Sequence, residues 1–242
     1  MEKLALSHHI SHQFNLELEN LRTRVFAMGG LVEQQVRDAV QALTTGDVAL
    51  ADAVIENDLK VNAMEVAIDE ECTHIIARRQ PAASDLRLLI AVIKTITDLE
   101  RIGDQAKKIA FMGRNLATME RPHNGYHEIH SLGGQVQGMV SRALDAFARL
   151  NVDAAVQVAK EDVPVDEKCQ STMGSLINDM MTEPSDIKRT LDVMWSIRAL
   201  ERIGDHAKNM SEYVIYLVQG KDVRHISLER LEKEATKPRG AS

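Results

Sequence analysis

The chain has 242 residues, a formal net charge of −7 and no dense cluster of lysine and arginine, so a nucleic acid is not expected as its partner. The longest apolar run, Leu88 to Ile93, is too short to cross a bilayer, and the N-terminus lacks the features of a signal peptide. Two cysteines, Cys72 and Cys169, do not suggest a disulfide framework and are expected to be buried free thiols. These features predict a cytoplasmic protein that reaches a membrane only indirectly, through its partners.

Helix-forming residues dominate the chain, aromatic residues make up only 3% of it, and alternating β-branched runs are missing. We therefore expect an all-α protein. In chain order, six long helices are predicted over residues 14–43, 47–78, 84–116, 128–150, 152–181 and 185–218. Residues 14–118 and 126–220 should form two three-helix bundles, and residues 221–242 should form a charged C-terminal tail or a short amphipathic helix.

Turn and cap residues support these limits. Gly46 and Asp47 separate the first two helices, and Ser84 or Asp85 can cap the third. Pro164 lies inside the fifth predicted helix, where it predicts a kink or an interruption.

An internal repeat divides the chain into two halves. The segment LERIGDQAKKIA, which starts at Leu99, recurs as LERIGDHAKNMS from Leu200, an offset of 101 residues. Upstream, the segment 28–32 (MGGLV) recurs as 132–136 (LGGQV), an offset of 104 residues. A short deletion between the second and third helices of the second half accounts for the difference. The repeat predicts two pseudo-symmetric bundles.

Each copy of the ERIGD motif carries two acids four residues apart: Glu100 and Asp104 in the first half, and Glu201 and Asp205 in the second. At 100° per residue, the first pair lies within about 20° of Ile93, on the line of the apolar stripe. A charge on this packed face must be compensated by an arginine, a partner helix or a cation.

A second row of oxygen-bearing side chains follows one stripe of the second helix in each half, with spacings of four, three and four residues. The row comprises Asp58, Asn62, Glu65 and Asp69 in the first half, but only Asp162 and Asp166 in the second, where Cys169 and Met173 take the later positions. The second site is therefore expected to be less complete. Carboxylate and amide oxygens without histidine or thiolate suit hard ions: Mg²⁺, Ca²⁺, Mn²⁺ or ferric iron.

The same acids also permit a plainer interpretation. Acidic rows on helices are often solvated faces or ion pairs, and Arg101 and Arg202 stand directly beside the motif acids. These two arginines are candidates for a structural ion pair or for contact with a partner. The recurrence of the motif in register, together with the second acidic row, favours the metal site.

The chain resembles the PhoU family of phosphate-signalling regulators. The resemblance rests on the segment Ile55–Cys72, on RRQPAASDLR at 78–87 and on the DLERIGD and ALERIGD segments, and it extends from about Leu18 to Val218. One departure concerns the residue a few positions after the motif, which is commonly asparagine in the family. Asn209 matches that pattern, whereas Lys108 replaces it in the first half and could weaken or reshape the first site.

The resemblance implies two pseudo-symmetric three-helix bundles, metal-binding E/DxxxD motifs at Glu100, Asp104, Glu201 and Asp205, and a homodimer. It also implies a negative regulator of the phosphate-starvation response. Such a protein acts in the cytoplasm and couples the ATPase of the phosphate ABC transporter to a sensor histidine kinase.

Two other functions compete with that of the regulator. A ferritin-like metal enzyme or iron store needs an ExxH motif on each of two helices, and only Glu71 and His74 provide one. A structural dimerisation bundle would use the acids as ion pairs, and metal analysis would distinguish it. Because no nucleophile with an adjacent base and no glycine-rich phosphate loop is present, we expect a binding protein and not an enzyme.

Overall fold

The computed structural model of the chain describes residues 2–120 and 126–235. In this part of the chain the secondary structure is helical, with no strand. The helices are α1 (Glu2–Thr45), α2 (Val48–Arg79), α3 (Ala83–Ala117), α4 (His127–Arg149), α5 (Val152–Thr182), α6 (Ile187–Gln219) and α7 (Leu228–Ala235), and a short 3₁₀ turn (Pro184–Asp186) precedes α6. The predicted all-α class is confirmed, although α1 starts well before its predicted limit.

The structure confirms some of the predicted helix ends and contradicts others. The side chain of Asp47 caps α2 by accepting a hydrogen bond from the Leu50 amide at 2.9 Å, and its counterpart in the repeat, Asn151, caps α5 in the same way. The prediction for α3 is wrong, because its N-cap residue is Ala82, which makes no side-chain bond. Helix α5 continues through Pro164 without the interruption that was one of the two expected outcomes.

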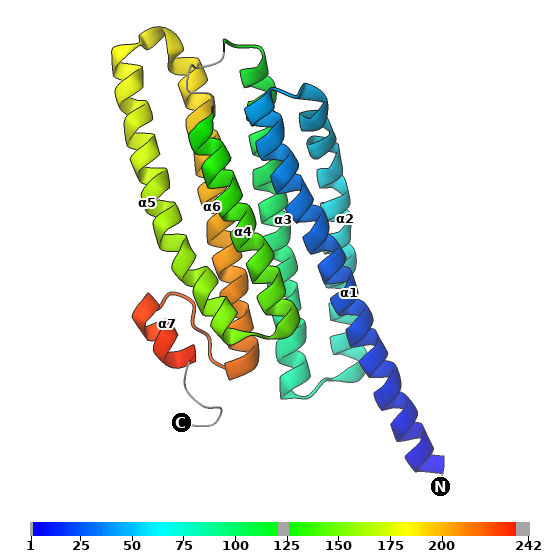
Figure 1. Cartoon of the computed structure of the whole chain (residues 1–242). Coiled ribbons are helices and arrows are strands. Elements are labelled where there is room, and N and C mark those ends of the chain that lie inside the picture. The colour runs from blue at the N-terminus through cyan, green and yellow to red at the C-terminus, as the bar shows by residue number, and fades with distance from the viewer. Residues whose placement is uncertain (1, 121–125, 236–242) are drawn as a thin grey trace.

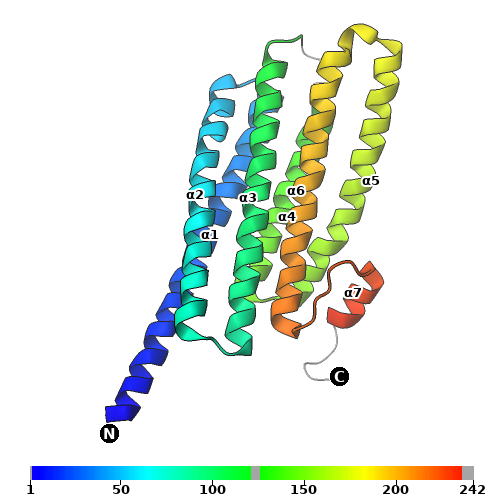
Figure 2. The same ribbon diagram turned by 180° about the vertical axis from the view of Figure 1, so that it is seen from behind.

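The two halves are three-helix bundles that stand side by side (Figure 1). Helices α1, α2 and α3 form the first bundle, and α4, α5 and α6 form the second. Helix α3 packs along α6 and α1 packs along α4, while α2 and α5 lie at opposite edges of the molecule (Figure 2). The helices that carry the ERIGD motifs are therefore central.

The contact between α1 and α4 follows the internal repeat. A Cβ atom on Gly29 of α1 would lie 2.7 Å from the Leu144 side chain of α4, and one on Gly133 of α4 would lie 2.6 Å from the Val40 side chain of α1. Gly29 and Gly133 occupy the same position of the repeat, as do Val40 and Leu144. The two halves thus pack through a reciprocal contact that needs a glycine on each side.

A buried polar cluster crosses between α3 and α6. The carboxylate of Asp98 lies 2.7 Å from Nδ1 of His206 and accepts a hydrogen bond of 2.7 Å from the hydroxyl of Tyr213. The repeat-equivalent positions hold Gln105 and Ala199, so the cluster exists only once. The cluster breaks the pseudo-symmetry of the two halves at the contact between α3 and α6.

The segment after α6, expected to be a tail or a short helix, contains α7. Leu231 and Ala235 of α7 are buried, and Glu232 pairs with Lys160 of α5 at 2.5 Å. The last seven residues lie outside the described part of the chain. Among the described residues, no helix combines the length and the apolar character that crossing a membrane requires.

Candidate metal centres

The acids of the first half come from two adjoining helices, α2 and α3. Asp58 is completely buried, whereas Glu65 and Glu100 are half-buried. Burial raises the pKa of Glu100, and the neighbouring carboxylates of Asp104, Glu65 and Asp58 raise it further. The predicted rows on the two helices therefore face one another, and their negative charges interact.

In the second half the acids are grouped more tightly. Carboxylate oxygens of Asp162, Asp166 and Asp205 all lie within 4.8 Å of one another, and the described part of the first half has no comparable group. Burial raises the pKa of Asp166 to about 6, with a further contribution from the charges of Asp162, Asp205 and Glu201. The tighter cluster therefore lies in the half with fewer acids, and the expectation of a less complete second site stays a prediction.

Buried oxygen atoms without a hydrogen-bond partner concentrate at these two sites. Buried polar atoms are nearly always satisfied in folded proteins, so each unsatisfied oxygen is informative. The unsatisfied oxygens are Oε1 of Gln35, Oδ1 of Asp58 and Oδ1 of Asn62 in the first half, and Oδ1 of Asp162, Oδ1 of Asp166 and Oε2 of Glu201 in the second. These atoms can accept bonds but cannot donate them, apart from protonated carboxyls, so the donor set fits a hard cation.

Two lysines that the sequence analysis did not single out reach into the sites. Nζ of Lys107 lies 2.7 Å from Oδ2 of Asp58, and Nζ of Lys208 lies 2.6 Å from Oδ2 of Asp162. Lys107 follows Asp104 by three residues, so helical spacing places it on the same face and could have revealed it. Lys108, which was expected to affect the first site, is exposed.

The glycine of each ERIGD motif sits beside the buried aspartate. A Cβ atom on Gly103 would lie 3.7 Å from Oδ1 of Asp58, and one on Gly204 would lie 3.7 Å from Oδ1 of Asp162. At this position a longer side chain would fill the space in front of the unsatisfied oxygen. At Gly103 the added Cβ atom would also lie 3.2 Å from Oε1 of Gln35, whereas at Gly204 its contacts would be at ordinary van der Waals distances.

Gln35 of α1 is a site residue that the sequence reasoning missed. It is buried, and its Oε1 atom would lie 3.2 Å from a Cβ atom on Gly103. The sequence around Gln35 gives no signal of this role, because the acids that it joins lie on the second and third helices of the half. Only the packing of α1 against α3 brings it to the acids.

The two sites differ in chemistry at four positions: Asn62 corresponds to Asp166, and at the three others the second half has sulfur in place of oxygen. At those three, Gln35 corresponds to Met139, Glu65 to Cys169 and Asp69 to Met173. Cys72 and Cys169 are both buried free thiols, as expected. Burial raises the pKa of the Cys169 thiol to about 12, with contributions from Glu201 and Asp166. The thiol is therefore protonated at neutral pH.

The arginines beside the motif acids lie outside this arrangement. Arg101 and Arg202 are both exposed on their helices. The arginine that forms an ion pair with a motif acid is Arg198, which contacts Oε1 of Glu201. A contact of Arg101 or Arg202 with a partner remains a prediction.

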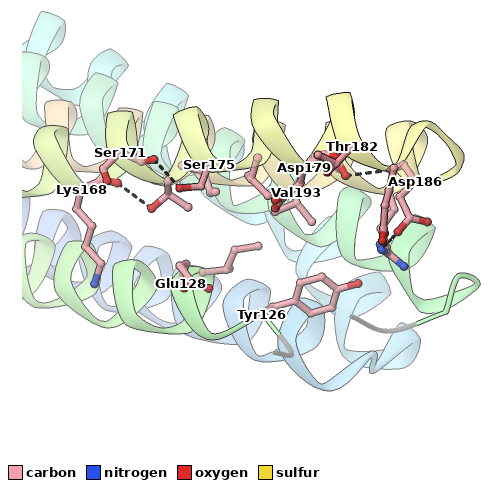
Figure 3. A pocket seen from close by; sticks show the side chains of 16 residues that line it. Tyr126, Glu128, Lys168, Ser171, Ser175, Asp179, Thr182, Asp186 and Val193 are labelled. Carbon is pink, nitrogen blue, oxygen red and sulfur yellow. Dashed lines mark hydrogen bonds and ion pairs between the residues drawn. The ribbon is translucent and has the colours of Figure 1, made fainter. Parts of the chain in front are cut away.

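A separate cavity of about 590 Å³ lies where α4 begins and α5 connects to α6 (Figure 3). Two cationic side chains of its lining have partners within the protein: Arg189 pairs with Asp186, and Lys168 donates to the Ser131 hydroxyl at 2.7 Å. None of the acids predicted as metal ligands is among its described lining residues. The cavity is therefore distinct from the two candidate metal centres.

Comparison with known proteins places this architecture in a family. The PhoU domain matches twice, over residues 25–112 and 129–214, so each bundle corresponds to one copy. The phosphate-specific transport system accessory protein PhoU homolog of Pseudomonas aeruginosa is 52% identical over 240 residues, covering 99% of both chains. The phosphate-specific transport system accessory protein PhoU of Escherichia coli is 45% identical over 234 residues, covering 96% of both chains.

Two solved structures are similar to this chain over most of its length. The crystal structure of PhoU from Pseudomonas aeruginosa has a TM-score of 0.84 at 52% identity and covers 86% of this chain and all of that one. The phosphate transport system regulatory protein PhoU from Streptococcus pneumoniae has a TM-score of 0.80 at 28% identity, covering 87% of this chain and 99% of that one. The duplicated domain and these relatives show that the chain belongs to the PhoU family.

Proposed function

We propose that this protein is a cytoplasmic negative regulator of the phosphate-starvation response. In this role it couples the ATPase of the phosphate ABC transporter to a sensor histidine kinase and acts by binding them, without catalysing a reaction. The observation that carries the proposal is the 52% identity, along nearly the whole chain, to a protein named as an accessory of phosphate-specific transport. The net negative charge of the chain and its lack of a basic cluster are consistent with protein partners.

Metal ions are the second component of the proposal. Glu100 and Asp104 would bind one ion together with residues of the α2 row, and Glu201 and Asp205 would bind another with Asp162 and Asp166. The unsatisfied buried oxygens at both sites support this assignment. A bound ion would supply positive charge between α2 and α3, or between α5 and α6, and so hold acidic faces together that repel each other without it.

The ferritin-like alternative has less support from the geometry. Its one ExxH pair comprises Glu71, which forms an ion pair with Arg24, and His74, which is exposed. This pair does not add a histidine to the acidic sites. The structural dimerisation bundle and the homodimer are separate proposals, which sedimentation of the purified protein with and without added metal would test.

The regulatory proposal is tested in cells. Deletion of the gene should leave phosphate-starvation genes switched on in phosphate-rich medium, and a strain that still represses them normally would defeat the proposal. Affinity purification at high and low phosphate should recover the transporter ATPase or the sensor kinase. Gln substitutions of Glu100 and Glu201 together should impair repression if metal is required, with exposed Glu167 as the matched control.

A further inference from the structure

Two lysines, Lys107 and Lys208, reach into the acidic sites. Each buried aspartate is bound by one ammonium group: Lys107 reaches Asp58 at 2.7 Å and Lys208 reaches Asp162 at 2.6 Å. The aspartate side chains are only 0% and 2% exposed, whereas the lysine side chains are 41% and 37% exposed. Each lysine therefore extends from the solvent to a carboxylate that water cannot reach.

The two ion pairs occupy equivalent positions in the repeat. Lys107 and Lys208 share the offset of 101 residues found for the ERIGD motifs, and Asp58 and Asp162 share the offset of 104 found upstream. Exposed ion pairs contribute little and form opportunistically. A pair between a buried acid and a lysine, made twice by different segments in the same geometry, is instead a property of the site.

Each lysine occupies only one side of its aspartate. The ammonium groups bind Oδ2, while Oδ1 of Asp58 and of Asp162 has no hydrogen-bond partner. Each Oδ1 also faces the motif glycine. The unsatisfied oxygen is thus available to a second positive group, which would approach close to the ammonium.

An ammonium group and a metal ion at the same aspartate repel each other strongly in a partly buried site. Lysine has a flexible four-carbon stem, and here that stem already leads to solvent, so the ammonium can leave without a change in the helices. We propose that Lys107 and Lys208 are internal counter-cations, which neutralise the buried aspartates in the metal-free protein and move into solvent when a metal ion binds. This inference rests on the proposed metal binding.

The internal counter-cation lowers the affinity of the site for metal, because the ion must displace it. It also stabilises the metal-free fold, since a buried carboxylate without a partner is costly. Removing the lysine charge should therefore have opposite effects on these two properties. A lysine that merely orients the aspartate for the metal would instead weaken metal binding when removed, by roughly 10–100-fold, as partners of metal ligands generally do.

The test uses the full chain, freed of metal with a chelator and titrated calorimetrically with Mn²⁺. The variants Lys107→Gln and Lys208→Gln keep a hydrogen-bond donor but lose the charge. We expect each to bind Mn²⁺ at its own site about tenfold more tightly than the unmodified protein. Each should also melt at a lower temperature without metal. The neighbouring exposed residue provides the matched control, because Lys108→Gln should change neither property.

A second measurement follows the lysines themselves. Acetylation of the protein with and without Mn²⁺, read by peptide mass spectrometry, should show Lys107 and Lys208 reacting several-fold faster when metal is bound, while Lys108 stays constant. Equal or weaker Mn²⁺ binding by both Gln variants, or unchanged acetylation, would overturn the counter-cation and leave metal binding itself intact. If neither the unmodified protein nor the variants bind Mn²⁺, both the metal centres and the counter-cations are refuted.

Discussion

Replacement of Asp166 by asparagine tests whether its ionised carboxylate destabilises the metal-free fold at the second site. Burial and the charges of Asp162, Asp205 and Glu201 raise the pKa of Asp166 from 3.8 to about 6. Because the folded-state pKa is above the unfolded one, ionised Asp166 destabilises the metal-free fold above pH 6, and this penalty disappears as the pH falls towards 4. The first half already carries an asparagine, Asn62, at this position, so the substitution fits the fold.

The expected magnitude follows from that pKa. A difference of about two pH units corresponds to at most roughly 3 kcal/mol at about 1.4 kcal/mol per unit. Asp166 is only partly buried, so solvent screening reduces the penalty, and we expect Asp166→Asn to stabilise the metal-free protein by about 1–2 kcal/mol at pH 7.5. For a chain of this length, such a gain raises the melting temperature by about 2–8 °C.

The assay is thermal unfolding, followed by circular dichroism at pH 7.5 and at pH 4, on protein freed of metal. The gain should be present at pH 7.5 and absent at pH 4. Glu167→Gln removes a charge from the next, exposed position of α5 and should change the stability by less than about 0.5 kcal/mol. An Asp166→Asn variant that is no more stable than the unmodified protein at pH 7.5, or that is equally stabilised at pH 7.5 and pH 4, would refute the destabilisation by ionised Asp166.

Three further predictions concern packing and the sites. Gly113→Ala should destabilise the protein by about 1–3 kcal/mol in urea unfolding, because the added Cβ atom would lie 3.0 Å from the backbone of α1. At Gly30 the added Cβ atom would meet open space, so Gly30→Ala should stabilise the protein by about 0.5–1 kcal/mol. Asp98→Ala should lower the free energy of unfolding by about 3–5 kcal/mol, since it leaves the polar groups between α3 and α6 unpaired. The double variant with His206→Ala should lose less stability than the sum of the losses of the two single variants. Glu201→Gln should weaken Mn²⁺ binding at the second site and leave the first largely intact, as measured by calorimetry, and equal loss at both sites would contradict two separate centres.

The helical periodicity and the repeat were sufficient to predict the class of fold and most of the helix limits. Apolar spacing defines which face of a helix is packed, and this information is local. It also placed Glu100 and Asp104 on the packed face, where the structure has them half-buried opposite the α2 row. The prediction for the cap of α3 was wrong because the helix starts at Ala83, ahead of both candidate residues, so that Ser84 and Asp85 lie inside its first turn.

Contacts between distant segments could be decided only by the tertiary structure. Gln35 reaches the first site from α1, and the tight group of Asp162, Asp166 and Asp205 depends on how α5 and α6 are rotated against each other. The pairing of Asp98 with His206 joins residues that are 108 positions apart. The sequence by itself determined which faces of the helices are buried and which acids recur. Which of those acids meet, and which lysine neutralises each one, was decided by the angles and rotations at which the long helices pack. Those angles depend on the side chains of both helices in a contact, so one segment alone does not determine them.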